Sequence, residues 1–184
     1  NYRFNTTSAQ ALRARTYLYM GRWSDALEAS KDVLSVYNEL EDMNNSTTLP
    51  NSYKSKENIV ALERFSSNLY TAVDMPASEF ISLYRSGDQR RTKYFKRVTS
   101  STYSLLKGRS DEFSCSFRTA EFYLTAAEAA ARLGHTTDAI NYLTPLMAKR
   151  LNASAYEATT ALIGTMTEEE LIQEILDERA RELA

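Results

Sequence analysis

Two copies of one short pattern constrain the fold of this chain more than any other feature. Residues 21–27 and residues 134–140 each run Gly, three variable residues, Asp, Ala and then Leu or Ile. An alanine-rich stretch precedes each copy, and after each copy apolar residues recur every three to four positions, which is the spacing of an amphipathic helix. Glycine permits a sharp turn between helices, and the alanine lets the second helix cross the first closely. Each copy therefore predicts a helix-turn-helix pair.

The two predicted pairs enclose a segment of different character. We expect the first pair within residues 1–38, where Asn5 would cap the first helix, and the second pair within residues 117–150. Residues 39–116 are instead rich in Asn, Ser and Thr, and their short apolar runs indicate short strands. A structureless loop of that length is unusual in a compact domain, so we expect an ordered, loop-rich insertion that carries recognition.

A last helix is expected over residues 167–184. It would begin at a capping box in which Thr167 and Glu170 satisfy each other's backbone donors, after a polar, alanine-rich linker over residues 151–166. The helical pattern still runs at residue 184, so we expect a fragment of a longer protein. The predicted fold is a single, mainly α domain of tetratricopeptide-like helix pairs, an α-α superhelix, with a loop-rich insertion carrying short strands.

Composition excludes several functional classes. With 22 basic and 24 acidic side chains the net charge is −2, which lacks the basic excess of a nucleic-acid binder. Cys115 is the only cysteine and His135 the only histidine, so neither a disulfide framework nor a zinc site is expected. The five glycines are isolated and form no phosphate-binding loop. No apolar run could span a membrane and no leader precedes the chain. We expect no metal, no cofactor and no catalytic residue.

One arginine lies where an apolar residue would be expected. Arg179 falls on the apolar stripe of the last helix, and burying an unpaired guanidinium is costly. Glu121 and Glu128 border the stripe of the helix near residue 120, and Arg118 precedes it within reach of Glu121. These four side chains predict an interhelical ion-pair cluster that fixes the final helix, with solvated charges at the edges of the stripes as the alternative.

Four stretches together resemble the SusD/RagB family of outer-membrane nutrient-binding lipoproteins. Residues 11–27 are similar to a helix pair of that family, and residues 88–90 to its D-x-R element. Residues 118–129 resemble its R-x-x-E-x-x-L-x-x-A-E-A helix, and residues 178–183 its E-R-x-x-E-L helix. The four elements occur in the order in which the family has them.

The resemblance implies a helical scaffold that holds a loop-rich region binding glycans or peptides. It implies no enzymatic activity, a place on the outer surface of the bacterial outer membrane, and a SusC-like TonB-dependent transporter as partner. Members carry a lipid anchor on a cysteine that follows a signal peptide, and Cys115 lies too far inside the chain to be that cysteine.

Four residues of the insertion are predicted to contact a ligand. Sugar recognition stacks aromatic rings on sugar rings, while amides and charged groups bond the hydroxyls. Tyr53 and Tyr70 lie in polar stretches without apolar periodicity, and Asn68 and Tyr84 supply an amide and a further ring. For each aromatic residue the competing interpretation is packing against the scaffold, which we favour for Trp23 because it begins an apolar stripe.

Two other functions compete with glycan binding. A tetratricopeptide-type adaptor would bind a peptide or protein in the groove of its helix pairs, but such proteins have tandem repeats of about 34 residues rather than two separated pairs. A glycan-cleaving enzyme would need a pair of carboxylates in an open cleft. Acidic residues of the insertion lack that context, so we expect binding without catalysis.

Overall fold

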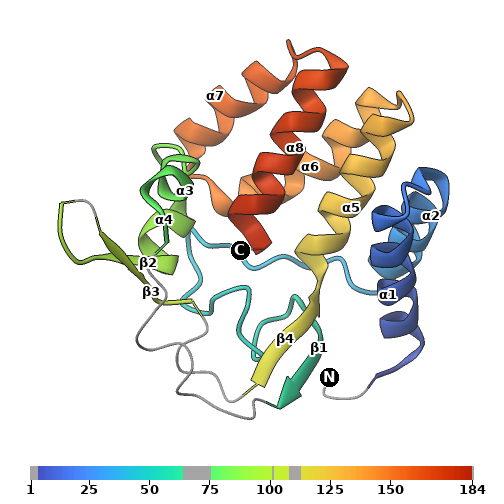
Figure 1. The fold of residues 1–184 in the computed structure, drawn as a ribbon, viewed down its shortest axis with the longest axis horizontal. Coiled ribbons are helices and arrows are strands. Elements are labelled where there is room, and N and C mark those ends of the chain that lie inside the picture. The colour runs from blue at the N-terminus through green and yellow to red at the C-terminus, as the bar shows by residue number, and fades with distance from the viewer. Residues whose placement is uncertain (1–3, 64–75, 101, 108–112, 184) are drawn as a thin grey trace.

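The computed structural model describes residues 4–63, 76–100, 102–107 and 113–183, and these residues form a mainly helical domain (Figure 1). The elements in chain order are α1 (Thr6–Tyr19), α2 (Trp23–Leu34), β1 (Asn58–Glu63), α3 (Ser78–Ser82), α4 (Gln89–Tyr94), β2 (Phe95–Arg97), β3 (Tyr103–Leu105), β4 (Phe113–Arg118), α5 (Thr119–Arg132), α6 (Thr136–Arg150), α7 (Ala153–Ile163) and α8 (Glu168–Leu183).

The first helix pair, α1 and α2, forms as predicted, with its turn at Gly21. The side chain of Asn5 accepts a hydrogen bond from the backbone N–H of Ser8 at 2.9 Å and so caps α1. Gly21 has φ of +69°, a left-handed conformation that a residue with a Cβ adopts only at a cost. Ala14 and Ala26 are fully buried. Small side chains on both helices therefore permit the close packing that the sequence predicts.

Helix α5 is the centre of the domain, because α1, α2, α6 and α8 all pack against it (Figure 1). Its alanines at 126, 127, 129, 130 and 131 are fully buried, together with Leu124. An almost continuous run of small residues lets neighbours approach this helix from several sides. Gly134, with φ of +76°, then turns the chain into α6, which continues through Pro145 to Arg150.

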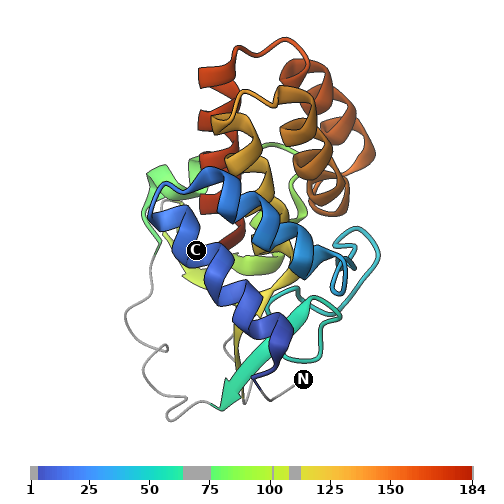
Figure 2. The ribbon, with the colours of Figure 1, turned by 90° about the vertical axis from the view of Figure 1, so that its right-hand side faces the viewer.

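The insertion folds against one end of this scaffold. Strand β1 pairs antiparallel with β4, which leads directly into α5, and β2 pairs antiparallel with β3. Figures 1 and 2 both place β1 and β4 at the end of the molecule opposite the α7–α8 connection. A small separate core of Met43, Ile81, Tyr84, Tyr94 and Phe95 holds α3, α4 and the β2–β3 hairpin together. The short strands expected within residues 39–116 are present, among them β1 and β3, which contain the apolar runs at 59–62 and 103–105.

The segment expected as a linker, residues 151–166, is instead mostly helix α7. The side chain of Asn152 caps it by accepting a hydrogen bond from the backbone N–H of Ala155 at 2.9 Å. One face buries Thr159 and Ile163, and the helix packs against α6. The error arose because threonine occupies one of the two buried positions, which interrupts the apolar periodicity, although the alanines of the segment favour a helix.

Helix α8 begins at the predicted capping box. The backbone N–H of Thr167 donates to Glu170 Oε2 at 2.8 Å, and the backbone N–H of Glu170 donates to Thr167 Oγ1 at 3.3 Å. The buried face of α8 combines apolar and acidic side chains. Leu171 and Ile175 are fully buried, while Glu174, Glu178 and Glu182 follow one another at four-residue spacing and are buried too.

Candidate functional site

Three of the sequence motifs meet in a buried network of ion pairs. Arg90 of the D-x-R element is fully buried. Its Nη2 lies 2.7 Å from an Asp88 oxygen, and its Nη1 lies 2.6 Å from Glu178 Oε1 and 2.9 Å from Glu182 Oε2. Arg118, at the start of the long helix motif, also pairs with Glu182. The D-x-R element, the α5 motif and the α8 motif therefore converge on one carboxylate.

Arg150 is the third guanidinium on that carboxylate, and it belongs to none of the sequence motifs. Its Nε donates to Glu182 Oε2 at 2.9 Å, and its Nη2 donates to Glu182 Oε1 at 3.0 Å and to Glu57 Oε1 at 2.7 Å. Its Nη1 donates to the backbone carbonyl of Glu41 at 2.6 Å. Both Arg150 and Glu57 are fully buried, so the network joins the scaffold to the insertion.

The guanidinium groups control how the buried acids titrate. Burial alone would raise the pKa of Glu182, but Arg150, Arg118 and Arg90 hold that pKa well below its usual range. Burial likewise opposes ionisation of Glu178, and Arg90 and Arg181 lower its pKa nonetheless. Glu57 differs, because burial raises its pKa in spite of Arg150. Two acids of the network are thus stabilised in the charged form.

These shifts predict a loss of stability in acid. Glu178 and Glu182 have folded-state pKa values below 4.5, so their contribution is fully present above that pH and is lost as pH falls through the folded-state values. Glu57 has a raised pKa and acts in the opposite direction. We expect the free energy of unfolding to decrease as pH drops below about 4.5. Urea unfolding at a series of pH values measures this, and a stability that rises on acidification would contradict it.

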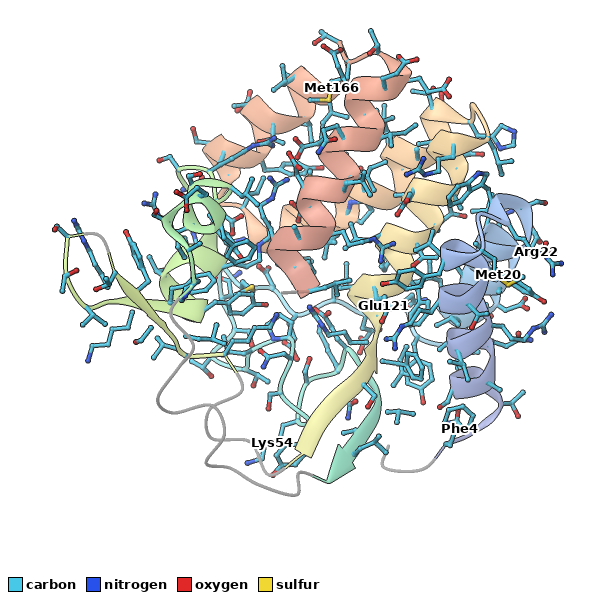
Figure 3. All side chains as sticks on the ribbon, in the orientation of Figure 1. Phe4, Met20, Arg22, Lys54, Glu121 and Met166 are labelled. Carbon is cyan, nitrogen blue, oxygen red and sulfur yellow. The ribbon has the colours of Figure 1, made fainter. Side chains whose placement is uncertain are left out.

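A polar pocket of about 370 Å³ opens beside this network. It lies between α1, the junction of β4 with α5, and the end of α8, where Glu121 is labelled in Figure 3. Its lining consists of Arg15, Tyr19, Ser116, Arg118, Glu121, Arg179 and Leu183. Charged groups thus surround a space that lies within the roughly 300–1,000 Å³ range typical of small-molecule sites.

Two ion pairs shape the walls of the pocket. Arg15 forms a bidentate pair with Glu121, with Nε–Oε1 and Nη2–Oε2 distances of 2.6 Å, and its Nη2 also donates to the backbone carbonyl of Ser116 at 2.8 Å. Arg179 Nε lies 3.3 Å from Glu128 Oε2, and its Nη2 donates to Thr125 Oγ1 at 3.3 Å. Because these side chains come from three elements, packing of the helices fixes the positions of both guanidinium groups.

The rim of the pocket carries an aromatic ring. Tyr19 is 84% exposed at the end of α1, so a face of its ring is open to a ligand. Charged groups below an exposed ring are the combination with which proteins bind hydroxylated rings, through stacking and hydrogen bonds. Sequence reasoning missed Arg15 and Tyr19 because both lie in a scaffold helix.

A second cavity of about 340 Å³ lies between the end of α7 and α8. Its lining includes Met166, labelled in Figure 3, and the acids Glu170, Glu174 and Asp177, but no aromatic residue. Among the described residues, no group of three or more His, Cys, Asp and Glu side chains is placed to hold a metal ion. We therefore take the pocket at Tyr19 as the candidate ligand site.

The predicted ion-pair cluster is distributed differently from the expectation. The structure brings Arg179 to Glu128, but it does not pair Arg118 with Glu121. Arg118 is the N-cap of α5 and has an extended backbone, with φ of −139° and ψ of 151°, so its side chain leaves the helix and reaches Glu182. Glu121 is paired by Arg15 of α1 instead. Helical spacing misled the prediction, because it does not apply to a residue before the first helical turn.

The residues predicted to bind ligand lie in different surroundings. Tyr53 is half-buried in the turn before β1, where its carbonyl accepts a hydrogen bond from Asn58 Nδ2 at 3.1 Å and Lys54 Nζ lies 5.4 Å from its ring centre. Tyr84 is only 2% exposed and its hydroxyl donates to the Arg181 carbonyl at 2.7 Å, so we withdraw it as a ligand contact. Asn68 and Tyr70 lie outside the described residues.

Comparison with known proteins places the fold. The sequence profile of the SusD family matches residues 87–184. No curated protein sequence matches the chain. Within the described part of the chain, no helix has the length and apolar character that crossing a membrane requires.

Several solved structures have a similar fold. A SusD superfamily protein from Bacteroides thetaiotaomicron is 22% identical with a TM-score of 0.79, over 100% of this chain and 48% of that one. A SusD-like carbohydrate binding protein from Bacteroides vulgatus is 21% identical with a TM-score of 0.72, over 99% and 43%. A SusD superfamily protein from Bacteroides fragilis is 23% identical with a TM-score of 0.70, over 96% and 44%. The chain spans less than half the length of each.

Proposed function

Because this chain belongs to the SusD family, we propose that it binds a nutrient glycan at the surface of a bacterial cell and delivers it to a SusC-like, TonB-dependent outer-membrane transporter. In this proposal the protein changes no bond of the glycan and needs no cofactor, and a lipid anchor outside these residues holds it to the outer membrane. A similar solved structure is described as a carbohydrate binding protein, which supports the choice of ligand class.

The polar pocket at Tyr19 is the observation that carries the proposal. A sugar ring stacked on Tyr19 would place its hydroxyls toward the guanidinium of Arg15 and the carboxylate of Glu121, which together offer donors and acceptors. Tyr53, with Asn68 and Tyr70, is proposed as a further contact for a longer oligosaccharide. The alternative of a peptide-binding adaptor has less support, because α2 packs directly on α5 and buried alanines fill the space between them.

The proposal predicts that Tyr19→Ala weakens glycan binding. Loss of one stacking ring should lower the affinity by about twofold to twelvefold, since an aromatic contact contributes roughly 0.5–1.5 kcal/mol. Affinity electrophoresis against a panel of polysaccharides identifies a bound glycan, and calorimetry with its oligosaccharide measures the dissociation constant. Tyr53→Ala tests the second proposed contact in the same assay.

Met20→Ala is the matched control, because Met20 is the next residue, is 60% exposed and does not line the pocket (Figure 3). Its affinity should equal that of the unchanged protein. An equal loss of glycan affinity in Tyr19→Ala and Met20→Ala would show that binding depends on the end of α1 rather than on the ring of Tyr19. Retention of specific peptides with no retardation by any glycan would favour the adaptor.

A further inference from the structure

The pocket at Tyr19 is lined by unequal numbers of positive and negative side chains. Three guanidinium groups line it, those of Arg15, Arg118 and Arg179, against the single carboxylate of Glu121. Both terminal nitrogens of Arg118 are engaged with Glu182, where Nη1 donates to the side chain and Nη2 to the backbone carbonyl. Arg15 and Arg179 are therefore the two guanidinium groups that a ligand could use.

Arg179 is short of partners. Its nearest carboxylate, Glu128, is shared, because Arg132 Nε donates to Glu128 Oε1 at 3.0 Å. Arg179 Nε lies 3.3 Å from the other oxygen but is buried without a hydrogen bond, so the contact is an ion pair only. Within the described chain, Arg179 donates one hydrogen bond, to Thr125. One carboxylate thus serves two guanidinium groups, which leaves an excess of positive charge at this wall.

Arg15 also retains a donor. Its Nε and Nη2 are occupied by Glu121 and by the Ser116 carbonyl, while its Nη1 donates to no acceptor among the residues that the structure describes. Its guanidinium is held 4.3 Å from the ring centre of Phe117, so it is fixed before any ligand arrives. A preorganised guanidinium loses little conformational freedom when it binds an anion.

The chemistry of the lining favours a carboxylate over other anions. A guanidinium binds the oxygens of a carboxylate and of a phosphate in the same way through its N–H groups, so the other groups of the pocket decide between these anions. Glu121 lies in the same pocket and repels a ligand that carries several negative charges on one ring. Tyr19 at the rim offers a face to a sugar ring. A sugar ring with one carboxylate satisfies all three conditions.

We propose that this pocket recognises a uronic acid unit of an acidic glycan, with its carboxylate bound by Arg179 and by Nη1 of Arg15 and its ring stacked on Tyr19. The inference rests on the proposed function and adds the class of sugar. The protein would then select glycans by charge at a site formed within the scaffold helices, apart from the loop-rich insertion.

The test compares two ligands that differ only in charge. Oligogalacturonate and the same oligomer with every carboxyl group methyl-esterified are titrated into the protein by calorimetry. We expect the acid form to bind at least about tenfold more tightly, because charged hydrogen bonds are lost in the ester. The preference should shrink in about 0.5 M salt, where charges of partly exposed groups are screened. Dextran sulfate serves as a general polyanion.

Two arginines on the same carboxylate provide matched variants. Arg179→Gln removes the proposed contact and should abolish the preference for the acid form. Arg132→Gln removes the other partner of Glu128. Because Arg132 does not line the pocket, this variant should keep the preference for the acid form. Circular dichroism and thermal unfolding establish that each variant folds, and Arg179→Met, which also removes the charge, replaces Arg179→Gln if the latter does not.

Each outcome separates the inference from the proposed function. Equal binding of acid and ester, or binding of neutral glycans alone, overturns the uronate inference and leaves glycan capture intact. Equal binding of dextran sulfate overturns it in favour of general attraction of anions. Loss of the preference in Arg132→Gln as well as in Arg179→Gln also overturns it. Binding of no glycan at all overturns the proposed function itself.

Discussion

Arg150→Met is expected to lower the free energy of unfolding by about 3–5 kcal/mol, because it removes one partner of a buried ion pair and leaves Glu57 with Arg118 alone, 3.8 Å away. Methionine fills much of the volume of the arginine stem but cannot donate a hydrogen bond. Glu57 would lose its nearest cation and Glu182 two of its hydrogen bonds, and both acids are fully buried. The Glu41 carbonyl would also lose a donor. Urea or thermal unfolding, followed by circular dichroism, measures the change.

Lys149→Met is the control for this prediction. Lys149 is the adjacent residue of α6, but its side chain is 42% exposed and its contact with Asp42 is 3.4 Å long. Exposed pairs of this kind contribute about 0–1 kcal/mol. A similar loss in both variants would mean that the end of α6 is sensitive for reasons other than buried charge. A loss under about 1 kcal/mol in Arg150→Met would show that the network relaxes around the missing group.

Gly87→Ala is the second substitution with a large expected effect, a loss of about 2–4 kcal/mol of stability. Gly87 has φ of +85°, which disfavours any residue with a Cβ. A Cβ at this position would lie 2.7 Å from the Cβ of Ala155 and 2.8 Å from Asn152 Oδ1. Both partners belong to the start of α7, and the backbone N–H of Asn152 donates to the Gly87 carbonyl at 2.9 Å. The added methyl group would therefore strain a contact between the insertion and the scaffold.

Gly164→Ala provides the matched comparison at another glycine. Gly164 has φ of −64°, and a Cβ there would meet no atom closer than 3.6 Å. Alanine should be tolerated and should increase stability by about 0.4–1 kcal/mol through the unfolded chain. The melting temperature should therefore fall in Gly87→Ala and rise in Gly164→Ala. Equal effects would indicate that neither the left-handed backbone nor the crowding at Gly87 matters.

Local features of the fold could be predicted from the sequence. The turn glycines, the Asn5 cap and the capping box at Thr167 depend on residues a few positions apart, and each forms as expected. The mainly helical fold with short strands in the insertion is confirmed. Helix α7 was missed because its buried face combines Thr159 with Ile163, which does not produce a regular apolar pattern.

The buried charges of the structure could not be predicted in the same way. Periodicity identifies apolar stripes, and it drew attention to Arg179, which stays partly exposed. The acids at four-residue spacing on α8, such as Glu178 and Glu182, are more deeply buried than Arg179, but acidic residues ordinarily indicate a solvated face. Their partners Arg90 and Arg150 are far away in sequence, so only the tertiary fold brings them together.

The carboxylate of Glu182 has a consequence for how the domain unfolds. It is the shared partner of guanidinium groups from the insertion, from the start of α5 and from the end of α6. Separating any of these groups from Glu182 takes away a buried counter-ion, which is costly even though Arg90 keeps Asp88 and Arg150 keeps Glu57. The loop-rich insertion and the helical scaffold are thereby joined into one cooperative folding unit, and neither half should persist as a stable intermediate while the other is unfolded.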